Sequence, residues 1–401
     1  MKSIKSVERA LRRYAIRVIS RLMHGRASSE ARLPRWHEGP HRVLFLRYDR
    51  IGDMIVSTGL IRAIASSHAT IELDVLASRE NAPVVSEEPH VRRVLVFERW
   101  KPWTYPALVR RLRRARYDAV VDWKLAGPSL TTLVLMLASG ARHRIGVSDR
   151  GIDSALTVVT PRFPESMHII DQLAALAAPF GVDVGDTDWS PRIALSPTEL
   201  ASAERTWAEA GIRARERRVL VNVSAGKTFR RWPDERFVKV LQHARSREPR
   251  ACLLVIGSPG ERIRVDRIAS ESGATALHPA TIRQAFGLVA TADLILSPDT
   301  SIGHAAAAFK RPAIVMYGHG YEARWGLYRS PGRCVSSPGR ELGALSAQAV
   351  IDVLDEVLQQ LGSAVRDQKP KASFSPTPPH GTPYLAPAPA KWLVREKDAP
   401  G

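Results

Sequence analysis

The chain has 401 residues, enough for two domains with substantial cores. Its 44% hydrophobic and 25% charged residues are typical of a soluble globular protein, and no run of about eighteen apolar residues marks a transmembrane span. The net charge of +19 indicates an acidic partner, which is a nucleic acid, an anionic membrane or a phosphorylated ligand. Two cysteines, Cys252 and Cys334, make no disulfide framework and fit a reducing compartment.

Residues 1–40 form a basic N-terminal extension that does not resemble a secretory signal, because arginines interrupt any apolar core. At helical spacing, apolar side chains share one face: Ile4, Val7, Leu11, Ala15, Val18 and Leu22. Cations fall on the opposite face: Lys5, Arg9, Arg12 and Arg13. This amphipathic pattern is typical of a helix on an anionic membrane surface, and equally of a helix packed on the body of the protein.

Strand and helix signals alternate through residues 41–185, which predicts a Rossmann-like domain with a parallel sheet. Short apolar runs predict strands at Val43–Leu46, Ile71–Leu76, Val94–Phe97 and Ala119–Asp122. Helical spacing predicts helices at Gly59–Ser66, Pro106–Ala115 and Ser129–Ser139.

The turn after the first strand is the most informative stretch of this domain. It carries Gly52 and Asp53 at the mouth of a helix. Open α/β sheets bind ligands at the carboxyl ends of their strands, so Asp53 is a candidate catalytic group.

A connector rich in Gly, Asp and Pro, residues 181–197, precedes a second Rossmann-like domain at residues 190–361. Its predicted strands are Val219–Val223, Cys252–Gly257, Leu294–Ser297 and Ala313–Tyr317. Its predicted helices are Pro233–Ala244, Ile282–Ala290, Ile302–Phe309 and Ser346–Leu361. Residues 363–401 are rich in Pro, Ala and Lys and predict a disordered tail.

The strand predicted just before Pro298 leads into a candidate anion site. Asp299, Thr300 and Ser301 offer oxygens that can cap the next helix, whose N-terminus attracts anions. Gly303 would let a ligand approach the backbone, and His304 lies in the first turn. A well-capped helix with a packing histidine shows the same pattern.

A second candidate anion site is the loop after Val223, which opens with Ser224. It carries Lys227, Arg230 and Arg231, three cations that can hold a phosphate. Trp232 and Pro233 then start a helix, with Pro233 expected in its first turn. A solvated basic loop is the alternative in so basic a chain.

Several common sites are excluded. Ala225-Gly-Lys-Thr228 resembles the end of a P-loop, but Val221 stands where that pattern needs glycine. The Asp186-Thr-Asp188 triplet lies in the connector, far from a strand end, and is expected to be solvated. No Gly-x-Gly-x-x-Gly follows a predicted strand, no zinc spacing occurs and no nucleic-acid-binding signature appears, so neither a metal, a dinucleotide cofactor nor a nucleic-acid partner is expected.

Three motifs occur in the order and spacing that resemble glycosyltransferase family 9, the heptosyltransferases of lipopolysaccharide synthesis: Ile51-Gly52-Asp53, Arg230-Arg231-Trp232-Pro233, and Pro298-Asp299-Thr300 with His304. The resemblance covers roughly residues 41–361. It implies a GT-B fold of two Rossmann-like domains facing across a cleft, with the acceptor on the N-terminal domain and the nucleotide sugar on the C-terminal one.

The same resemblance implies transfer of heptose from ADP-heptose to an anionic lipopolysaccharide core, with inversion and without an obligatory metal. Asp53 matches the family's general base, and Asp299, Thr300 and His304 match donor contacts. The family often has lysine where this chain has Arg230, and glycine where it has Ser301. Those departures bear on which nucleotide sugar is used. Glu261, after the strand ending at Gly257, can accept hydrogen bonds from ribose hydroxyls, although it is equally an exposed first-turn glutamate.

An anionic acceptor would also explain the net positive charge of the chain. Anionic lipid at the inner face of the cytoplasmic membrane would attract so basic an enzyme. Three alternatives remain at the level of sequence. One is a GT-B epimerase or a transferase for another surface glycan. Another is a non-catalytic protein that binds sugar nucleotides or lipids at the membrane. The third is a basic nucleic-acid binder, which the missing nucleic-acid-binding signature disfavours.

Overall fold

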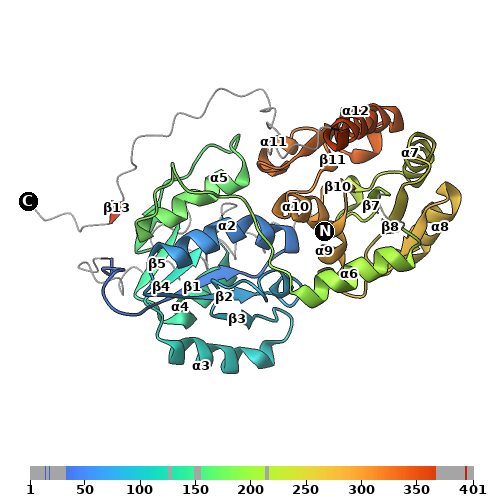
Figure 1. The fold of residues 1–401 in the computed structure, drawn as a ribbon. Helices are drawn as coiled ribbons and strands as arrows, with labels where there is room; N and C mark the ends of the chain where they lie inside the picture. The colour runs from blue at the N-terminus through green and yellow to red at the C-terminus, as the bar shows by residue number, and fades with distance from the viewer. Residues whose placement is uncertain are drawn as a thin grey trace, which may run out of the picture. The chain divides into compact units, whose positions relative to one another are not determined.

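The computed structural model describes residues 33–124, 129–148, 155–212 and 216–366, together with Tyr14, Val18, Leu393 and Val394. The chain divides into two compact units, with the boundary between Trp189 and Ser190 (Figure 1). The amphipathic helix expected in residues 1–40, and most of the tail expected at 363–401, lie outside the described residues.

The first unit is built on a seven-stranded sheet in the order β13-β6-β5-β4-β1-β2-β3. The strands are β1 (His41–Arg47), β2 (Ile71–Ala77), β3 (Arg93–Val96), β4 (Ala119–Asp122), β5 (His143–Val147), β6 (Val158–Thr160) and β13 (Leu393–Val394). All pair in parallel except β13, which runs antiparallel to β6. The helices are α2 (Ile51–Ser67), α3 (Tyr105–Ala115), α4 (Leu130–Ser139), α5 (Ile169–Ala174) and the 3₁₀ helices η1 (Ala82–Val84), η2 (Pro102–Thr104) and η4 (Ala175–Phe180).

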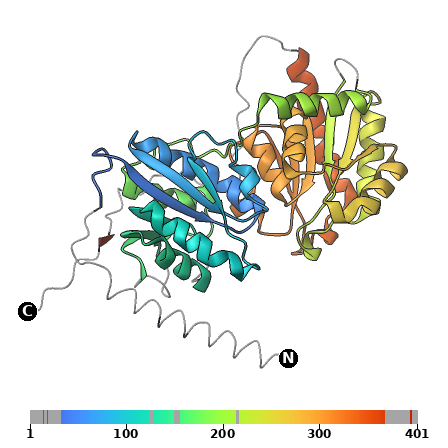
Figure 2. The same cartoon turned by 90° about the horizontal axis from the view of Figure 1, so that it is seen from below.

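Helices cover both faces of this sheet (Figures 1 and 2). On one face, α3 and α4 bury Leu112 and Leu133 against Leu44 and Leu46 of β1. On the other, α2 packs with α5 and η4. Continuous apolar runs such as β1 follow from burial on both faces, which is characteristic of parallel sheets.

The second unit is built on a six-stranded parallel sheet in the order β12-β11-β10-β7-β8-β9. The strands are β7 (Arg218–Asn222), β8 (Cys252–Ile256), β9 (Thr275–Leu277), β10 (Leu294–Pro298), β11 (Ala313–Tyr317) and β12 (Gly332–Ser336). The helices are α6 (Pro197–Glu209), α7 (Asp234–Arg247), α8 (Arg262–Ser272), α9 (Ile282–Thr291), α10 (Ser301–Ala308), α11 (Glu322–Trp325) and α12 (Ala347–Arg366), with the 3₁₀ helices η5 (Thr228–Arg230), η6 (Pro259–Glu261) and η7 (Leu342–Ala344). Trp232, Phe237 and Val265 are central to its core.

Some boundaries differ from those expected from the sequence. Helix α2 begins at Ile51 rather than Gly59, so Gly52 and Asp53 lie inside its first turn. Helix α6 begins within the expected connector, where Ser196 and Glu199 form a capping box. Pro233 is the residue before α7 rather than a member of its first turn, and α12 extends to Arg366, into the segment expected as a tail.

Candidate active site

Asp53 is held at the carboxyl end of β1 by a buried arginine. Arg47, the last residue of β1, is fully buried. Its Nε donates to the backbone oxygen of Asp53 at 2.7 Å, and its Nη2 donates to the same oxygen. The Arg47 guanidinium carbon lies 3.0 Å from the ring centroid of Trp123, a stacked cation–π contact. Arg47 Nη2 lies 3.8 Å from Asp53 Oδ1, and the Asp53 side chain is 16% exposed. The backbone of Asp53 is therefore fixed while its carboxylate keeps access to solvent.

Two further carboxylates surround the same guanidinium. Asp49 Oδ1 lies 3.6 Å from Arg47 Nε, and Asp122 ends β4 beside β1, paired in register with Leu46. Burial raises the pKa of Asp122 to about 6 and also raises the pKa of Asp49, against the opposing charge of Arg47. Burial lowers the pKa of Arg47, and the three neighbouring carboxylates counteract that effect. The edge of the sheet around Asp53 thus carries several acidic groups at once.

A cation and a phenol complete this edge. Tyr48 hydrogen-bonds through its hydroxyl to Thr132 Oγ1 at 2.8 Å. Lys124 Nζ donates to the same hydroxyl at 3.1 Å. The sequence prediction included Asp53 but missed Arg47, Asp122 and Lys124. Ala119–Asp122 was correctly predicted as a strand, so an acidic residue at its carboxyl end was a usable signal.

In the second unit, an asparagine and two hydroxyls organise the N-terminus of α10. Asn222, the last residue of β7, donates through Nδ2 to Ser297 Oγ at 3.0 Å and to Thr300 Oγ1 at 3.1 Å. Thr300 is the N-cap and accepts from the backbone N–H of Ile302 at 3.3 Å. Ser301 is the first helical residue, so Thr300 caps the helix and Asp299 does not.

Asp299 instead forms an ion pair with Arg230. Arg230 Nη1 lies 2.9 Å from Asp299 Oδ2, and the Asp299 side chain is only 5% exposed. The rings of Phe229 and Tyr321 lie 5.5 and 5.7 Å from the Arg230 guanidinium carbon. This pairing brings two sequence-predicted residues together and fixes the guanidinium next to the N-terminus of α10.

The remaining predicted residues of the basic loop differ in exposure. Lys227 and Arg231 are exposed, and Lys227 Nζ lies 5.8 Å from the ring of Phe229. Ser224 Oγ accepts from the backbone N–H of Ser258 at 2.5 Å. Lys227 and Arg231 are thus the exposed cations of the loop, and Arg230 is its ion-paired one.

Glu261 is engaged within its own turn. Its carboxylate accepts from Ser258 Oγ at 2.7 Å and lies 3.2 Å from Nη1 of the buried Arg264. The carboxylate is therefore orientated at the end of β8 by neighbours rather than free in solvent.

His304 and Gly303 are buried in the first turn of α10. The His304 ring lies 6.2 Å from the indole of Trp325. A Cβ on Gly303 would come within 3.1 Å of Val315 Cγ1, so this glycine permits close packing of α10 on β11. Close packing of α10 on β11 is therefore a second explanation for glycine at this position, beside the expected approach of a ligand to the backbone.

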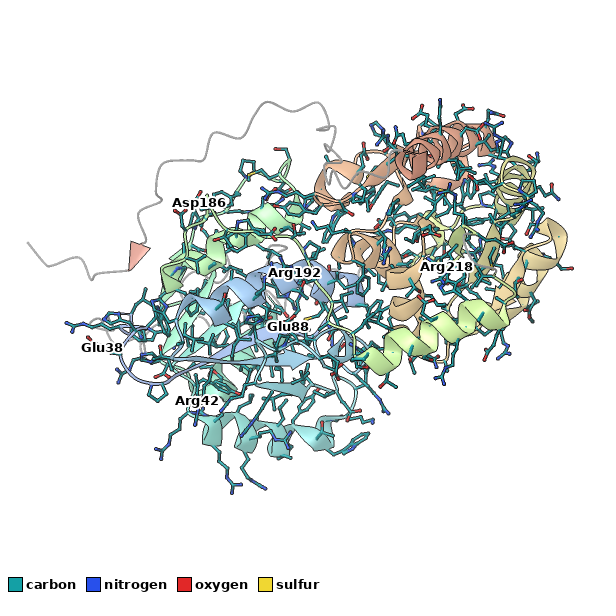
Figure 3. All side chains as sticks on the ribbon, viewed as in Figure 1. Glu38, Arg42, Glu88, Asp186, Arg192 and Arg218 are labelled. Carbon is teal, nitrogen blue, oxygen red and sulfur yellow. The ribbon has the colours of Figure 1, made fainter. Side chains whose placement is uncertain are left out.

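Neither a metal centre nor a membrane span is evident in the described ranges. Within them, no group of three His, Cys, Asp or Glu side chains is placed to hold a metal ion. Asp186 and Asp188 are exposed in the connector, where Figure 3 labels Asp186. Of the helices in the described ranges, none has both the length and the hydropathy required to cross a bilayer.

Comparison with known proteins identifies the family. The family model of glycosyltransferase family 9 (heptosyltransferase) matches residues 106–351, which is more than half of the chain. The chain belongs to glycosyltransferase family 9. The resemblance first seen in its three motifs is therefore confirmed, and this family 9 protein is a glycosyltransferase.

The family 9 glycosyltransferase is also similar to individual relatives. Lipopolysaccharide heptosyltransferase 3 of Escherichia coli K12 is 24% identical over 67% of this chain and 79% of its own length. The crystal structure of a family 9 glycosyltransferase from Veillonella parvula matches with a TM-score of 0.72 at 15% identity, covering 81% of this chain and 99% of that one. The structure of E. coli ADP-heptose LPS heptosyltransferase II matches with a TM-score of 0.65 at 19% identity, covering 80% and 99%. The predicted GT-B class, with two parallel-sheet Rossmann-like units, is confirmed.

Proposed function

We propose that this glycosyltransferase moves a heptose from ADP-heptose onto the core of lipopolysaccharide or a related anionic surface glycolipid, with inversion. The names of its relatives support both substrates, because the similar E. coli proteins are lipopolysaccharide heptosyltransferases and one is named for ADP-heptose. Inverting transfer is a single displacement, so it requires a base for the acceptor and stabilisation of the departing diphosphate.

The observation that carries the proposal is the setting of Asp53. Its backbone is fixed by the buried Arg47, and its carboxylate is partly exposed at the carboxyl end of β1, next to Gly52. In the proposed step, an Asp53 oxygen takes the proton of an acceptor hydroxyl. The hydroxyl oxygen bonds to the anomeric carbon as the bond from that carbon to the diphosphate breaks, and ADP leaves.

The charge of the departing diphosphate is assigned to the second unit. Arg230, with Lys227 and Arg231, supplies positive charge, and the N-terminus of α10 at Thr300 and Ser301 supplies backbone N–H groups. Asp299 orientates Arg230 through the 2.9 Å ion pair. In this proposal, the three cations and the helix N-terminus stabilise the negative charge of the diphosphate, and no metal or other cofactor is required.

The remaining residues receive supporting roles in donor binding. Glu261 accepts from ribose hydroxyls, held in place by Ser258 and Arg264. Ser224 accepts from the backbone N–H of the same Ser258 at 2.5 Å. His304 and Gly303 line the first turn of α10, where His304 stands near the donor phosphates.

We place the enzyme in the cytoplasm, peripherally on the inner face of the cytoplasmic membrane. An anionic glycolipid acceptor and a net charge of +19 favour that position. Deletion of residues 1–26 is expected to weaken sedimentation with anionic vesicles. Unchanged sedimentation would exclude a membrane role for this segment.

The donor is tested by a thermal-shift panel of ADP-heptose, UDP-sugars and GDP-sugars. Ligand at about 100 times its Kd stabilises a protein by about 2.7 kcal/mol, so ADP-heptose is expected to raise Tm and the others are not. Selective stabilisation by a UDP- or GDP-sugar would instead assign a transferase for a different surface glycan. ADP alone is the matched control, because it separates recognition of the nucleotide from recognition of the sugar.

A further inference from the structure

Helix α3 and the loop before it present an unusual surface, here called the α3 surface: Trp100, Trp103, Arg110, Arg111 and Arg114. Trp100 is 84% exposed and Trp103 is 73% exposed, whereas tryptophan side chains are on average largely buried. The three arginines are exposed too. Leu112 is the one residue of α3 that is fully withdrawn from solvent, so most of the helix faces outward.

The arginines of α3 continue into a basic pocket between the helix and the sheet. This cavity of about 370 Å³ is lined by six arginines: Arg42, Arg92, Arg93, Arg110, Arg111 and Arg114. Arg42, labelled in Figure 3, reaches the end of α3, where it donates to the Ala115 carbonyl at 3.0 Å. The pocket lies at the amino ends of the strands, so it is distinct from the site around Asp53.

The positive charge of this pocket exceeds what the fold neutralises. Arg92 pairs with Asp74 at 2.7 Å and with Glu72 at 2.8 Å, and Arg42 pairs with the same Glu72 at 3.1 Å. Tyr117 also donates to Asp74 at 2.7 Å. The two carboxylates, Glu72 and Asp74, thus form ion pairs with Arg42 and Arg92.

In the part of the chain that the structure describes, the other four arginines that line the pocket form no such ion pair. Within the described ranges, no hydrogen bond or ion pair engages the guanidinium groups of Arg93, Arg110, Arg111 and Arg114. Guanidinium forks bind phosphate groups with two parallel hydrogen bonds, so a cluster of four calls for a polyanionic partner.

The tryptophans determine which polyanion fits. An indole is an amphipathic ring that partitions to the interface between lipid headgroups and acyl chains. Trp100 and Trp103 follow β3, which is parallel to β1 through β2. They therefore lie at the carboxyl edge of the sheet, the edge that carries Asp53.

We propose that the α3 surface docks on a bilayer that contains anionic phospholipid, with its two indoles in the interface and its arginines on lipid phosphates. This docking is a property of the folded first unit, separate from any contribution of residues 1–26. It rests on the peripheral membrane position proposed above and adds the surface of the folded unit that makes the contact; neither donor nor acceptor is needed for it.

The first test is flotation of the full chain with phosphatidylcholine vesicles that contain or lack phosphatidylglycerol. One variant carries Arg110→Gln, Arg111→Gln and Arg114→Gln. Each cation near an anionic surface contributes about a fivefold gain in partitioning, so the variant is expected to bind phosphatidylglycerol vesicles about 100-fold more weakly.

The matched control removes the same charge from exposed positions of the second unit: Arg205→Gln, Lys239→Gln and Arg250→Gln. It is expected to bind as the wild type does. Equal loss in both triple variants would show that only net charge matters and would overturn the proposal. Vesicle binding of the α3 variant within about threefold of wild type would overturn it as well.

The second test reports the tryptophans directly. Vesicles made with brominated phosphatidylcholine and phosphatidylglycerol quench indoles that enter the interface. Wild-type fluorescence is expected to be quenched, and the variant with Trp100→Phe and Trp103→Phe is expected to lose most of that quenching. Equal quenching in the variant would overturn the proposal, as would tight binding of wild type to a DNA duplex together with no binding to vesicles. Since neither test contains donor or acceptor, failure here leaves the proposed transfer reaction untouched.

Discussion

Asp122 makes a defined contribution to the pH dependence of folding. It is 3% exposed at the end of β4, and its pKa is raised from 3.8 to about 6, chiefly by burial. A difference of about 2 pKa units corresponds to about 3 kcal/mol in the free energy of unfolding. Because the folded state holds this proton more tightly than the unfolded state, the contribution is fully present below about pH 4 and is lost as the pH rises through about 6.

The variant Asp122→Asn is neutral at every pH and lacks this term. The free energy of unfolding, measured by urea denaturation at a series of pH values, is therefore expected to fall by about 3 kcal/mol more in wild type than in the variant between about pH 4 and pH 7. Asp186→Asn changes an exposed carboxylate of the connector and is expected to leave the wild-type profile unchanged. Parallel profiles for wild type and Asp122→Asn would refute the assignment of a buried, proton-binding carboxyl to this position.

Two further predictions concern the second unit. Gly257→Ala would place a Cβ 2.6 Å from Val265 Cγ2 and is expected to lower the free energy of unfolding by about 1–3 kcal/mol, whereas Gly260→Ala, with no atom within 4 Å of its Cβ, is expected to leave it unchanged in the same urea titration. Equal effects would contradict the packing at the end of β8. Arg230→Gln removes the ion pair between Arg230 and the buried Asp299 carboxylate, and is expected to destabilise the fold by about 3 kcal/mol and to weaken ADP-heptose binding by about 10–100-fold in calorimetry. Adding Asp299→Asn is expected to restore stability but not affinity; recovery of affinity in the double variant would reduce Arg230 to a structural residue.

Continuous apolar runs made the sheets predictable. Strands β4 and β11 match their predicted bounds because each is buried on both faces and leaves no polar interruption. Strand β9 (Thr275–Leu277) was missed because it is short and partly exposed at one edge of the sheet. Strand β12 (Gly332–Ser336) is longer but lies partly exposed at the other edge, so it has no continuous apolar run. Helix α2 was predicted to start late because its N-cap, Arg50, forms no side-chain cap.

Residues of the candidate site that belong to a local sequence motif could be predicted. Contacts between residues far apart in the sequence could not. Asp53 and Asp299 follow strands in the sequence, so their position at a sheet edge was foreseeable. The pairing of Asp299 with Arg230 joins residues 69 positions apart, and no local pattern reports it. The same holds for Arg47 stacked on Trp123, since an arginine inside a strand is indistinguishable in sequence from one on a surface.

The central claim is that Asp53 is the base in transfer from ADP-heptose. The most direct measurement compares release of ADP by wild type and Asp53→Asn in the presence of ADP-heptose and a lipopolysaccharide core acceptor, alongside calorimetric binding of the donor. We expect turnover to fall by about 10²–10⁴-fold while donor affinity is unchanged, and Asp49→Asn, which removes a neighbouring carboxylate from Arg47, to lose far less. Turnover by Asp53→Asn at the wild-type rate would contradict the claim and leave Asp53 as a structural residue of α2.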